Sequence, residues 1–286
     1  MSHRLQAPRP SRLHLVSEPA SAVESEFGVP IPGTILPEEQ WARTAIKRLP
    51  PPGPLDFTAI FGRTAPVVLD LGCGNGRSTL TSALARPEMD HFAVDILPVV
   101  IRYFTRRANQ RGLHNVRIAV IGGRELLRDY IAAGSVAEIH CYHPQPYYDR
   151  REIHKRLIVP EFLALVHRAL QPGGRFVVQT DNPAYAKYMQ SILPSFFVVE
   201  EHPQRWPDAP QGRTRREILA LQQGLPVFRA KCRRRDELTE ANLDVAVESL
   251  PRATFDADRR LQKYDRLESG ESAPSTGPSP RRRRSR

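Results

Sequence analysis

The chain has 286 residues, of which 40% are hydrophobic and 26% are charged, so it has enough apolar side chains for one sizeable domain or two small ones. No apolar run approaches the roughly 20 residues of a membrane-spanning helix, so we expect no membrane span. The formal net charge of +11 favours a polyanionic partner. The three cysteines, Cys73, Cys141 and Cys232, lie far apart and do not suggest a disulfide framework. Because the N-terminus also lacks the apolar stretch of a secretory signal, we predict a cytoplasmic protein.

The two ends of the chain differ in composition from its middle. Repeated prolines in residues 1–54 disfavour long helices and central strands, so we expect a partly disordered extension with at most a short helix over 38–47. Residues 269–286 are rich in Ser, Pro and Gly and end in RRRRSR, which predicts a disordered basic tail. Between these ends we predict a central domain over 55–235 and a C-terminal helical extension over 236–268.

Strands and helices alternate five times in the central domain. Short apolar strands are predicted over 67–71, 91–95, 116–120, 136–142 and 175–180. Helices are predicted to begin at residue 78 and to cover 99–111, 125–132 and 160–170, with a break at the QPGG of 171–174. Short links between buried-type strands indicate an α/β fold with a doubly wound, mostly parallel sheet.

A glycine-rich turn, GCGNG, follows the first predicted strand. Gly72, Gly74 and Gly76 allow the backbone to approach a ligand closely and to turn into a helix whose N-terminus offers free N–H groups. Asp95 ends the second predicted strand, where a carboxylate can accept hydrogen bonds from both hydroxyls of a ribose. Asp70, two residues before the first glycine, suits a cationic group and would repel a pyrophosphate. The pattern predicts a site for a nucleoside cofactor.

A polar loop over 143–156 follows the fourth predicted strand, at the edge where parallel α/β sheets bind ligands. Its prolines stiffen it, its two tyrosines can stack on a base, and its basic side chains can contact phosphates. These basic residues are Arg150, Arg151, His154, Lys155 and Arg156. The alternative is a rigid loop that packs on its own domain. Two histidines and one acid without a second ligand cluster do not predict a metal site.

A second basic region lies between residues 201 and 235, where nine basic residues face only three acidic ones. The terminal arginines can be explained as a solvated tail, but this internal imbalance favours a polyanionic partner. Within the region, Thr214 and Glu217 have the spacing of a helix capping box, which needs no ligand. A helix N-terminus can also be presented to a phosphate or a base.

Together these motifs resemble the bacterial tRNA (guanine-N7)-methyltransferase family. The resemblance runs from Val67 to Arg235 and is carried by the glycine turn, by the block 143–182 and by the QGRTRRE of 211–217. It implies a class I, Rossmann-like methyltransferase fold with a C-terminal antiparallel strand, so that 55–235 would be the methyltransferase domain. It also implies S-adenosylmethionine as cofactor and transfer of a methyl group to N7 of a variable-loop guanine in tRNA. Whether the protein is a monomer or a homodimer stays open.

By matching position, the resemblance implies roles for individual residues. Cofactor contacts fall on Asp70, Gly72, Gly74, Gly76, Asp95, Gly122 and Gln145. Guanine or tRNA contacts fall on Asp149, Arg150, Lys155, Asp181, Thr214, Arg215, Arg216 and Glu217. Gln145 and Asp181 would act at the reaction itself.

Several of these positions depart from the family pattern, and the family's Thr-Lys-Phe-Glu signature is Thr214-Arg215-Arg216-Glu217 here. Gly122 replaces an acid that holds the adenine amino group, Gln145 replaces an acid in the polar loop, and Asp149 replaces a lysine. Guanine N7 carries a lone pair and no proton, so its methylation needs alignment rather than a general base. Gln145 can still accept one hydrogen bond through its carbonyl oxygen. We expect a reduced rate or an altered target, and weaker adenine binding unless a backbone amide or Arg124 compensates.

Two alternatives stay open. The changed loop residues would also suit a divergent paralogue that methylates another nucleobase or a small acceptor. The basic surface would suit a non-catalytic RNA-binding relative, although an intact glycine turn with Asp70 and Asp95 argues against that alternative.

Overall fold

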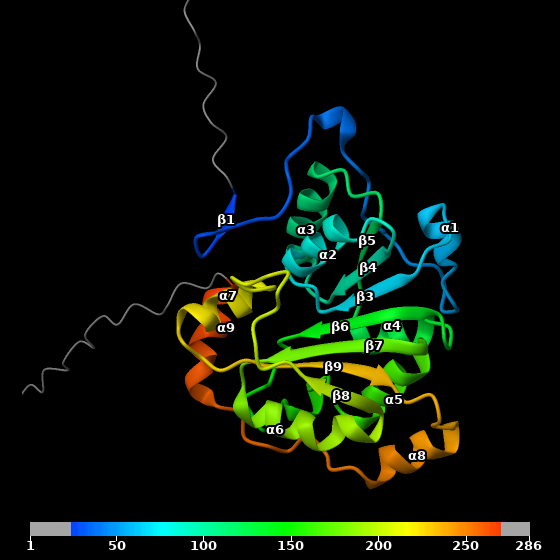
Figure 1. Ribbon diagram of the computed structural model, residues 1–286, viewed down its shortest axis with the longest axis vertical. Helices are drawn as coiled ribbons and strands as arrows, with labels where there is room; N and C mark the ends of the chain where they lie inside the picture. Colours follow the sequence, from blue (N-terminus) through cyan, green and yellow to red (C-terminus); the bar gives the residue numbers. More distant parts are fainter. Residues whose placement is uncertain (1–23, 270–286) are drawn as a thin grey trace, which may run out of the picture.

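The computed structural model describes residues 24–269, with side chains up to residue 267. Within this range, seven strands form one mixed sheet in the order β5-β4-β3-β6-β7-β9-β8 (Figure 1). Their bounds are β3 (Val67–Leu71), β4 (Asp90–Asp95), β5 (Val116–Val120), β6 (Val136–Tyr142), β7 (Leu170–Thr180), β8 (Phe197–Glu201) and β9 (Phe228–Arg234). Strands β3 to β7 pair in parallel, whereas β9 pairs antiparallel with both β7 and β8. The predicted fold class, including the antiparallel strand, is confirmed.

Helices cover both faces of this sheet. Ala93 and Ile118 point to the face covered by α2 and α3, whereas Phe92, Val94 and Ala119 point to the face covered by α4 and α5. The longer helices are α1 (Phe57–Phe61), α2 (Arg77–Ala85), α3 (Pro98–Gln110), α4 (Gly123–Tyr130), α5 (Pro160–Ala169), α6 (Pro183–Ile192), α7 (Arg215–Gln222), α8 (Glu240–Ser249) and α9 (Gln262–Ser269). The short ones are η1 (Glu38–Gln40), η2 (Ile153–Lys155), η3 (Leu193–Ser195) and η4 (Arg259–Leu261). None of the helices between residues 24 and 269 has the length and apolarity to cross a membrane.

Two local predictions need correction. Strand β7 begins at Leu170 rather than after the expected break, but its pairing with β6 is interrupted over 171–174: Leu170 lies opposite Val136, and the next pair is Arg175 with Glu138. The short helix expected over 38–47 is limited to η1. The rest of that segment is extended because it pairs with β5: Ile46 N–H donates to the Ile118 carbonyl, and Ile118 N–H donates to the Thr44 carbonyl.

The C-terminal extension packs on the same core as the central domain. Leu243 of α8 is buried in the main hydrophobic cluster, and Leu238, Val247 and Leu250 pack against that cluster. The domain boundaries at 54 and 235 stay a prediction. Residues 1–23 and 270–286, which include most of the predicted disordered tail, lie outside the described residues.

Candidate cofactor and acceptor site

The glycine turn (residues 72–76) links β3 to α2, with Gly76 as the residue that precedes the helix. Gly76 has a φ of 81°, and a Cβ there would lie 1.9 Å from the Phe104 ring, so no other residue fits without displacing α3. At Gly72 and Gly74 the space that a Cβ would occupy is open. The turn therefore presents bare backbone to a ligand on one side and packs tightly on the other.

Asp95 connects the end of β4 to this turn. One of its carboxylate oxygens accepts from Gly74 N–H at 3.0 Å, and the other accepts from Leu97 N–H at 2.9 Å. Burial raises the pKa of Asp95, although these backbone hydrogen bonds favour its charged form. The next residue, Ile96, is 63% exposed. A carboxylate beside an exposed apolar side chain suits a ribose that carries a flat base.

Asp70 is 3% exposed and lies in β3 below the turn. Its Oδ2 accepts from the Thr79 hydroxyl at 2.5 Å, while Oδ1 is buried without a hydrogen-bond partner among residues 24–267. Burial raises the pKa of this carboxyl group, and the charge of His140 opposes that effect. A buried carboxylate oxygen that lacks a partner fits the cationic end of the expected cofactor.

Glu125 fills the space that Gly122 leaves. A Cβ on Gly122 would lie 2.1 Å from Oε2 of Glu125 and 3.6 Å from Cγ2 of Ile96. Arg124, the compensating residue that we considered from the sequence, points elsewhere and donates to the Arg156 carbonyl at 3.2 Å. A carboxylate is thus present next to residue 122, supplied from the first turn of α4. Sequence reasoning missed it, although three residues along a helix bring side chains to one face.

The acceptor loop (residues 143–156) is tied down by a buried arginine. Arg156 is 1% exposed and donates to the carbonyls of Pro146 at 2.6 Å and Tyr147 at 3.0 Å within the loop. It also donates to the carbonyls of Ala253 at 2.6 Å and Phe255 at 2.8 Å in the C-terminal extension. The expectation that Arg156 contacts phosphate is wrong, because all these bonds are internal and burial excludes a surface ligand.

The other charged residues of the loop lie at the surface in local ion pairs. Asp149 pairs with Arg151 at 2.5 Å, and this pairing lowers the pKa of Asp149 to about 2. Arg150 pairs with Asp256 at 3.2 Å, and Lys155 pairs with Glu152 at 2.9 Å. Such exposed pairs contribute little to stability, so they can be exchanged for a ligand. The substrate contacts expected at Asp149, Arg150 and Lys155 stay predictions.

Asp181, directly after β7, is the centre of a buried polar cluster. Its Oδ1 lies 3.2 Å from His143 Nδ1, and its Oδ2 accepts from Arg216 Nε at 2.8 Å. Burial acts to raise the pKa of Asp181, but His143 and Arg216 outweigh it and lower the pKa to about 2. Gln145 lines the same pocket and is exposed. The structure thus brings together the two residues expected at the reaction.

The Thr214–Glu217 motif forms only half of a capping box. Thr214 accepts from Glu217 N–H at 3.0 Å, at the start of α7. The Glu217 carboxylate instead accepts from Arg213 N–H at 2.8 Å and from Arg229 Nε at 2.7 Å, and the Glu217 residue is fully buried. The structure encloses Glu217, so direct contact with a ligand would require this region to move. The guanidinium of Arg215, the first residue of α7, does not join this ion pair and lies 5.0 Å from the centroid of the Phe27 ring.

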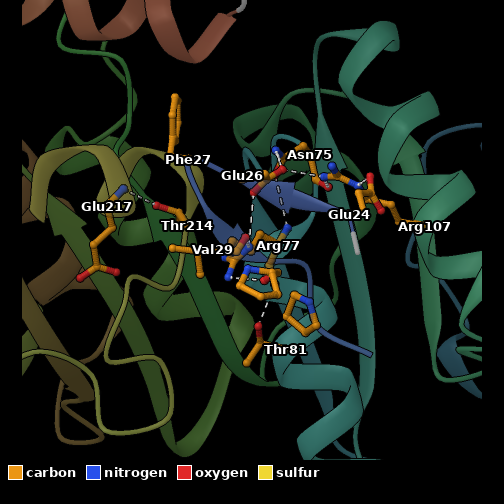
Figure 2. A network of polar contacts seen from close by, with 12 residues as sticks. Glu24, Glu26, Phe27, Val29, Asn75, Arg77, Thr81, Arg107, Thr214 and Glu217 are labelled. Carbon is orange, nitrogen blue, oxygen red and sulfur yellow. Dashed lines mark hydrogen bonds and ion pairs between the residues drawn. The ribbon is translucent and has the colours of Figure 1, made fainter. Parts of the chain in front are cut away.

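An N-terminal hairpin (residues 24–30) lies against the glycine turn, as Figure 2 shows. Glu26 contacts the side chain of Asn75 and pairs with Arg107 at 2.7 Å and with Arg77 at 3.7 Å. At its tip, the Phe27 carbonyl accepts from Gln222 of α7 at 2.7 Å. The hairpin thus spans from the cofactor side to α7. The contact of this hairpin with the glycine turn and α7 was not predicted from the sequence. Its signal there is limited to two acids, Glu24 and Glu26, shortly before Pro30 and Pro32.

Comparison with known proteins places this architecture in a family. A family model described as a putative methyltransferase matches residues 64–230. A tRNA (guanine-N(7)-)-methyltransferase from Alkalilimnicola ehrlichii is 30% identical over 199 residues, which cover 68% of this chain and 84% of the relative. The chain belongs to the tRNA (guanine-N7)-methyltransferase family. The resemblance inferred from the motifs is confirmed.

Other relatives in this methyltransferase family align over a smaller share. The enzyme of the same name from Arthrobacter sp. strain FB24 is 35% identical over 158 residues, 54% of this chain and 50% of the relative. The enzyme of that name from Bordetella pertussis is 37% identical over 142 residues, which cover 50% of this chain and 56% of the relative. The chain therefore spans about half the length of these relatives. The matched segment 64–230 leaves the N-terminal hairpin, α8 and α9 outside.

A solved structure supports the class I methyltransferase fold. The 16S rRNA methyltransferase KamB superposes with a TM-score of 0.51 at 17% identity, covering 67% of this chain and 98% of its own. At that identity the likeness concerns the fold alone. Within residues 24–267, no group of three or more His, Cys, Asp or Glu side chains is arranged to hold a metal ion.

Proposed function

We propose that this protein transfers a methyl group from S-adenosylmethionine to N7 of a variable-loop guanine in tRNA. One observation carries the proposal beyond family membership: Asp70 lies near the end of β3, and Gln145 and Asp181 follow the neighbouring strands β6 and β7, so the cofactor turn and the acceptor pocket open at one edge of the sheet. This is the edge where open α/β sheets bind their ligands. We also propose the cytoplasm as the location and leave the oligomeric state open.

On the cofactor side, the proposed contacts fall on carboxylate oxygens and on backbone with an open approach. When bound, S-adenosylmethionine supplies an electrophilic methyl group on a sulfonium centre. The unpartnered oxygen of Asp70 would face its cationic end, and Asp95 would accept from the ribose hydroxyls. Glu125 would accept from the adenine amino group, in place of a side chain at Gly122. The open space over Gly72 and Gly74 leaves room for close backbone contact.

On the acceptor side, the residues have to hold guanine rather than deprotonate it. N7 attacks through an in-plane lone pair, so the work is alignment in a site from which water is excluded. Asp181, kept ionised by His143 and Arg216, would accept from the N1–H or amino group of the base. Gln145 would accept one further hydrogen bond through its carbonyl oxygen.

A methyl-transfer assay on unmodified tRNA with labelled S-adenosylmethionine tests the proposal. We expect label on one variable-loop guanine, found by cleavage at N7-methylguanine. Label on another base, or on a small acceptor only, would support the divergent paralogue instead. Binding of tRNA without binding of S-adenosylhomocysteine would support the non-catalytic relative.

Removing the Glu125 carboxylate tests the cofactor pocket separately. We expect Glu125→Ala to weaken binding of S-adenosylhomocysteine about tenfold in calorimetry, since one charge-assisted hydrogen bond is lost. The wild-type protein should bind the 6-oxo analogue S-inosylhomocysteine about tenfold more weakly than S-adenosylhomocysteine, and the variant should not discriminate between them.

Two further variants serve as the control and the rescue. Glu161→Ala removes an exposed acid from the first turn of α5 and should leave affinity unchanged. The double variant Gly122→Asp, Glu125→Ala moves the carboxylate to the neighbouring position and should restore binding. Equal discrimination in Glu125→Ala and wild type would remove Glu125 from the adenine site.

A further inference from the structure

Helix α9 places a carboxylate inside the acceptor pocket. Arg216 lies between two acids: its Nε donates to Asp181 at 2.8 Å, and its Nη1 lies 2.6 Å from Oδ1 of Asp265 in α9. The Arg216 side chain is 3% exposed and that of Asp265 is 19% exposed. Asp265 lies outside the segment 64–230 that matches the family model. A residue of the C-terminal extension thus occupies part of the proposed substrate site.

The pocket that Asp265 helps to line is too small for a base in this structure. Gln145, Asp181, Asn182, Arg216 and Asp265 are among its lining residues, and the free volume is about 10 Å³. That volume holds about one water molecule, whereas pockets that bury small ligands measure about 300 Å³ or more. A purine can enter only after the lining has moved. Asp265 is the only one of these five that belongs to the C-terminal extension.

The polar groups around Asp265 suit an anionic oxygen. Asn182 is 2% exposed and lines the pocket; its Oδ1 caps α6, and its Nδ2 has no hydrogen-bond partner within residues 24–267. Arg216 offers a planar guanidinium, which binds carboxylate and phosphate in the same way. Burial raises the pKa of Asp265, while Arg216 and the Tyr148 hydroxyl favour its charged form. A phosphate could therefore replace the Asp265 carboxylate, and Arg216 would still pair with a negatively charged group.

A small apolar cluster, separate from the main core, packs α9 on α7. Leu261 and Tyr264 pack with Leu219 of α7, and Arg215 donates to the Leu267 carbonyl at 3.4 Å. Figure 1 shows α9 lying beside α7. A helix of eight residues is marginal on its own and depends on such packing. Detachment of α9 is a local opening that leaves the sheet and the main core intact.

We propose that α9 is an internal plug, in which Asp265 takes the place of a substrate phosphate on Arg216. Helix α9 must leave Arg216 before a nucleic acid occupies the pocket. The inference rests on the proposed function for the nature of the substrate. It differs from a supporting role of Asp265, in which the carboxylate would help Arg216 and Asp181 to bind the acceptor.

The variant Asp265→Asn separates these roles. For a plug, we expect the dissociation constant for tRNA, measured by fluorescence anisotropy, to fall about tenfold, since competition within the chain is removed. In methyl transfer, kcat/KM should rise by the same factor while kcat changes little. Weaker binding, or binding equal to wild type, would overturn the plug.

Two more variants complete this test. Tyr264→Ala loosens α9 without changing a charge in the pocket, and it should also tighten tRNA binding. Asp244→Asn is the matched control: it makes the same charge change in the same extension, at an exposed acid paired with Arg168. That control should bind tRNA as the wild type does. If it tightens binding as much as Asp265→Asn, net charge rather than the plug is responsible.

Hydrogen exchange of the full chain reports the opening directly. We expect the amides of residues 262–269 to exchange faster when tRNA, or poly(U) as a phosphate polymer without guanine, is added. Increased protection of α9 by either RNA would overturn the plug, and opening by tRNA alone would overturn the assignment to phosphate. Neither this measurement nor the anisotropy uses the cofactor. They therefore decide on the plug even if wild-type protein methylates no tRNA and the proposed function fails.

Discussion

Replacing Glu217 by glutamine is expected to lower the free energy of unfolding by about 3–5 kcal/mol, the usual cost of breaking a buried ion pair from one side. The side chains of Glu217 and Arg229 are 1% and 3% exposed, and Arg229 Nη2 lies 2.6 Å from Oε1 of Glu217. The variant leaves the Arg229 charge enclosed with only the Val227 carbonyl at 3.1 Å as a further partner of its guanidinium within the described chain. Urea unfolding followed by circular dichroism measures the loss.

The matched control is Glu200→Gln, at an exposed position of β8. Its free energy of unfolding should stay within about 0.5 kcal/mol of wild type. If Glu217→Gln also stays within that range, the ion pair with Arg229 does not support the start of α7. The hydrogen bond from Glu217 N–H to the Thr214 hydroxyl would then be the interaction that fixes the start of α7.

Replacing Asp181 by asparagine is expected to lower kcat/KM for tRNA by about 100-fold or more. The reason is that a charged acceptor for the guanine edge becomes neutral, and loss of one charge-oriented hydrogen bond in an active site has effects of this size. Methyl transfer under subsaturating tRNA gives the ratio directly. Binding of S-adenosylhomocysteine should be unchanged, since Asp181 is proposed to contact only the acceptor.

The same residue predicts an acid dependence of stability. The folded-state pKa of Asp181 is lowered from 3.8 to about 2, so the unfolded chain binds this proton more readily. Its contribution to stability is therefore fully present above about pH 4 and is lost as the pH falls toward 2. Asp181→Asn should flatten the decline of stability over that window. A profile parallel to wild type would contradict the pairing of Asp181 with His143 and Arg216.

The elements and the glycine turn were predictable because their signals are local. Strands such as β3 and β5 are short apolar segments between turns, and the glycine turn needs positive φ at positions close in sequence. Asp95 follows from the same logic, since it ends a strand next to that turn. Each of these signals lies within one strand or turn, which a single sequence displays.

The acceptor side was less predictable because its contacts are long-range. The sequence suggests that Arg156 contacts phosphate, yet two of its four carbonyl partners lie almost a hundred residues away at Ala253 and Phe255. Asp265 has no motif, and only folding brings it to Arg216. Glu26 likewise reaches Arg107 from an N-terminal stretch that proline content alone predicts as extended. In each case a charged side chain meets its partner only in the folded structure, and the periodicity of the sequence does not predict that contact.

The bonds of Arg156 also bear on where this protein can be shortened. A truncation at residue 235, the limit suggested by the family motifs, would remove the carbonyls of Ala253 and Phe255 and strip two acceptors from a guanidinium that is 1% exposed. It would also expose the ring of Tyr185, which packs 5.0 Å from that of Phe255. For expression and crystallisation, the smallest useful fragment therefore has to retain the chain through at least Phe255. The C-terminal extension lies outside the segment matched by the family model, yet its carbonyls hold the acceptor loop in place through Arg156.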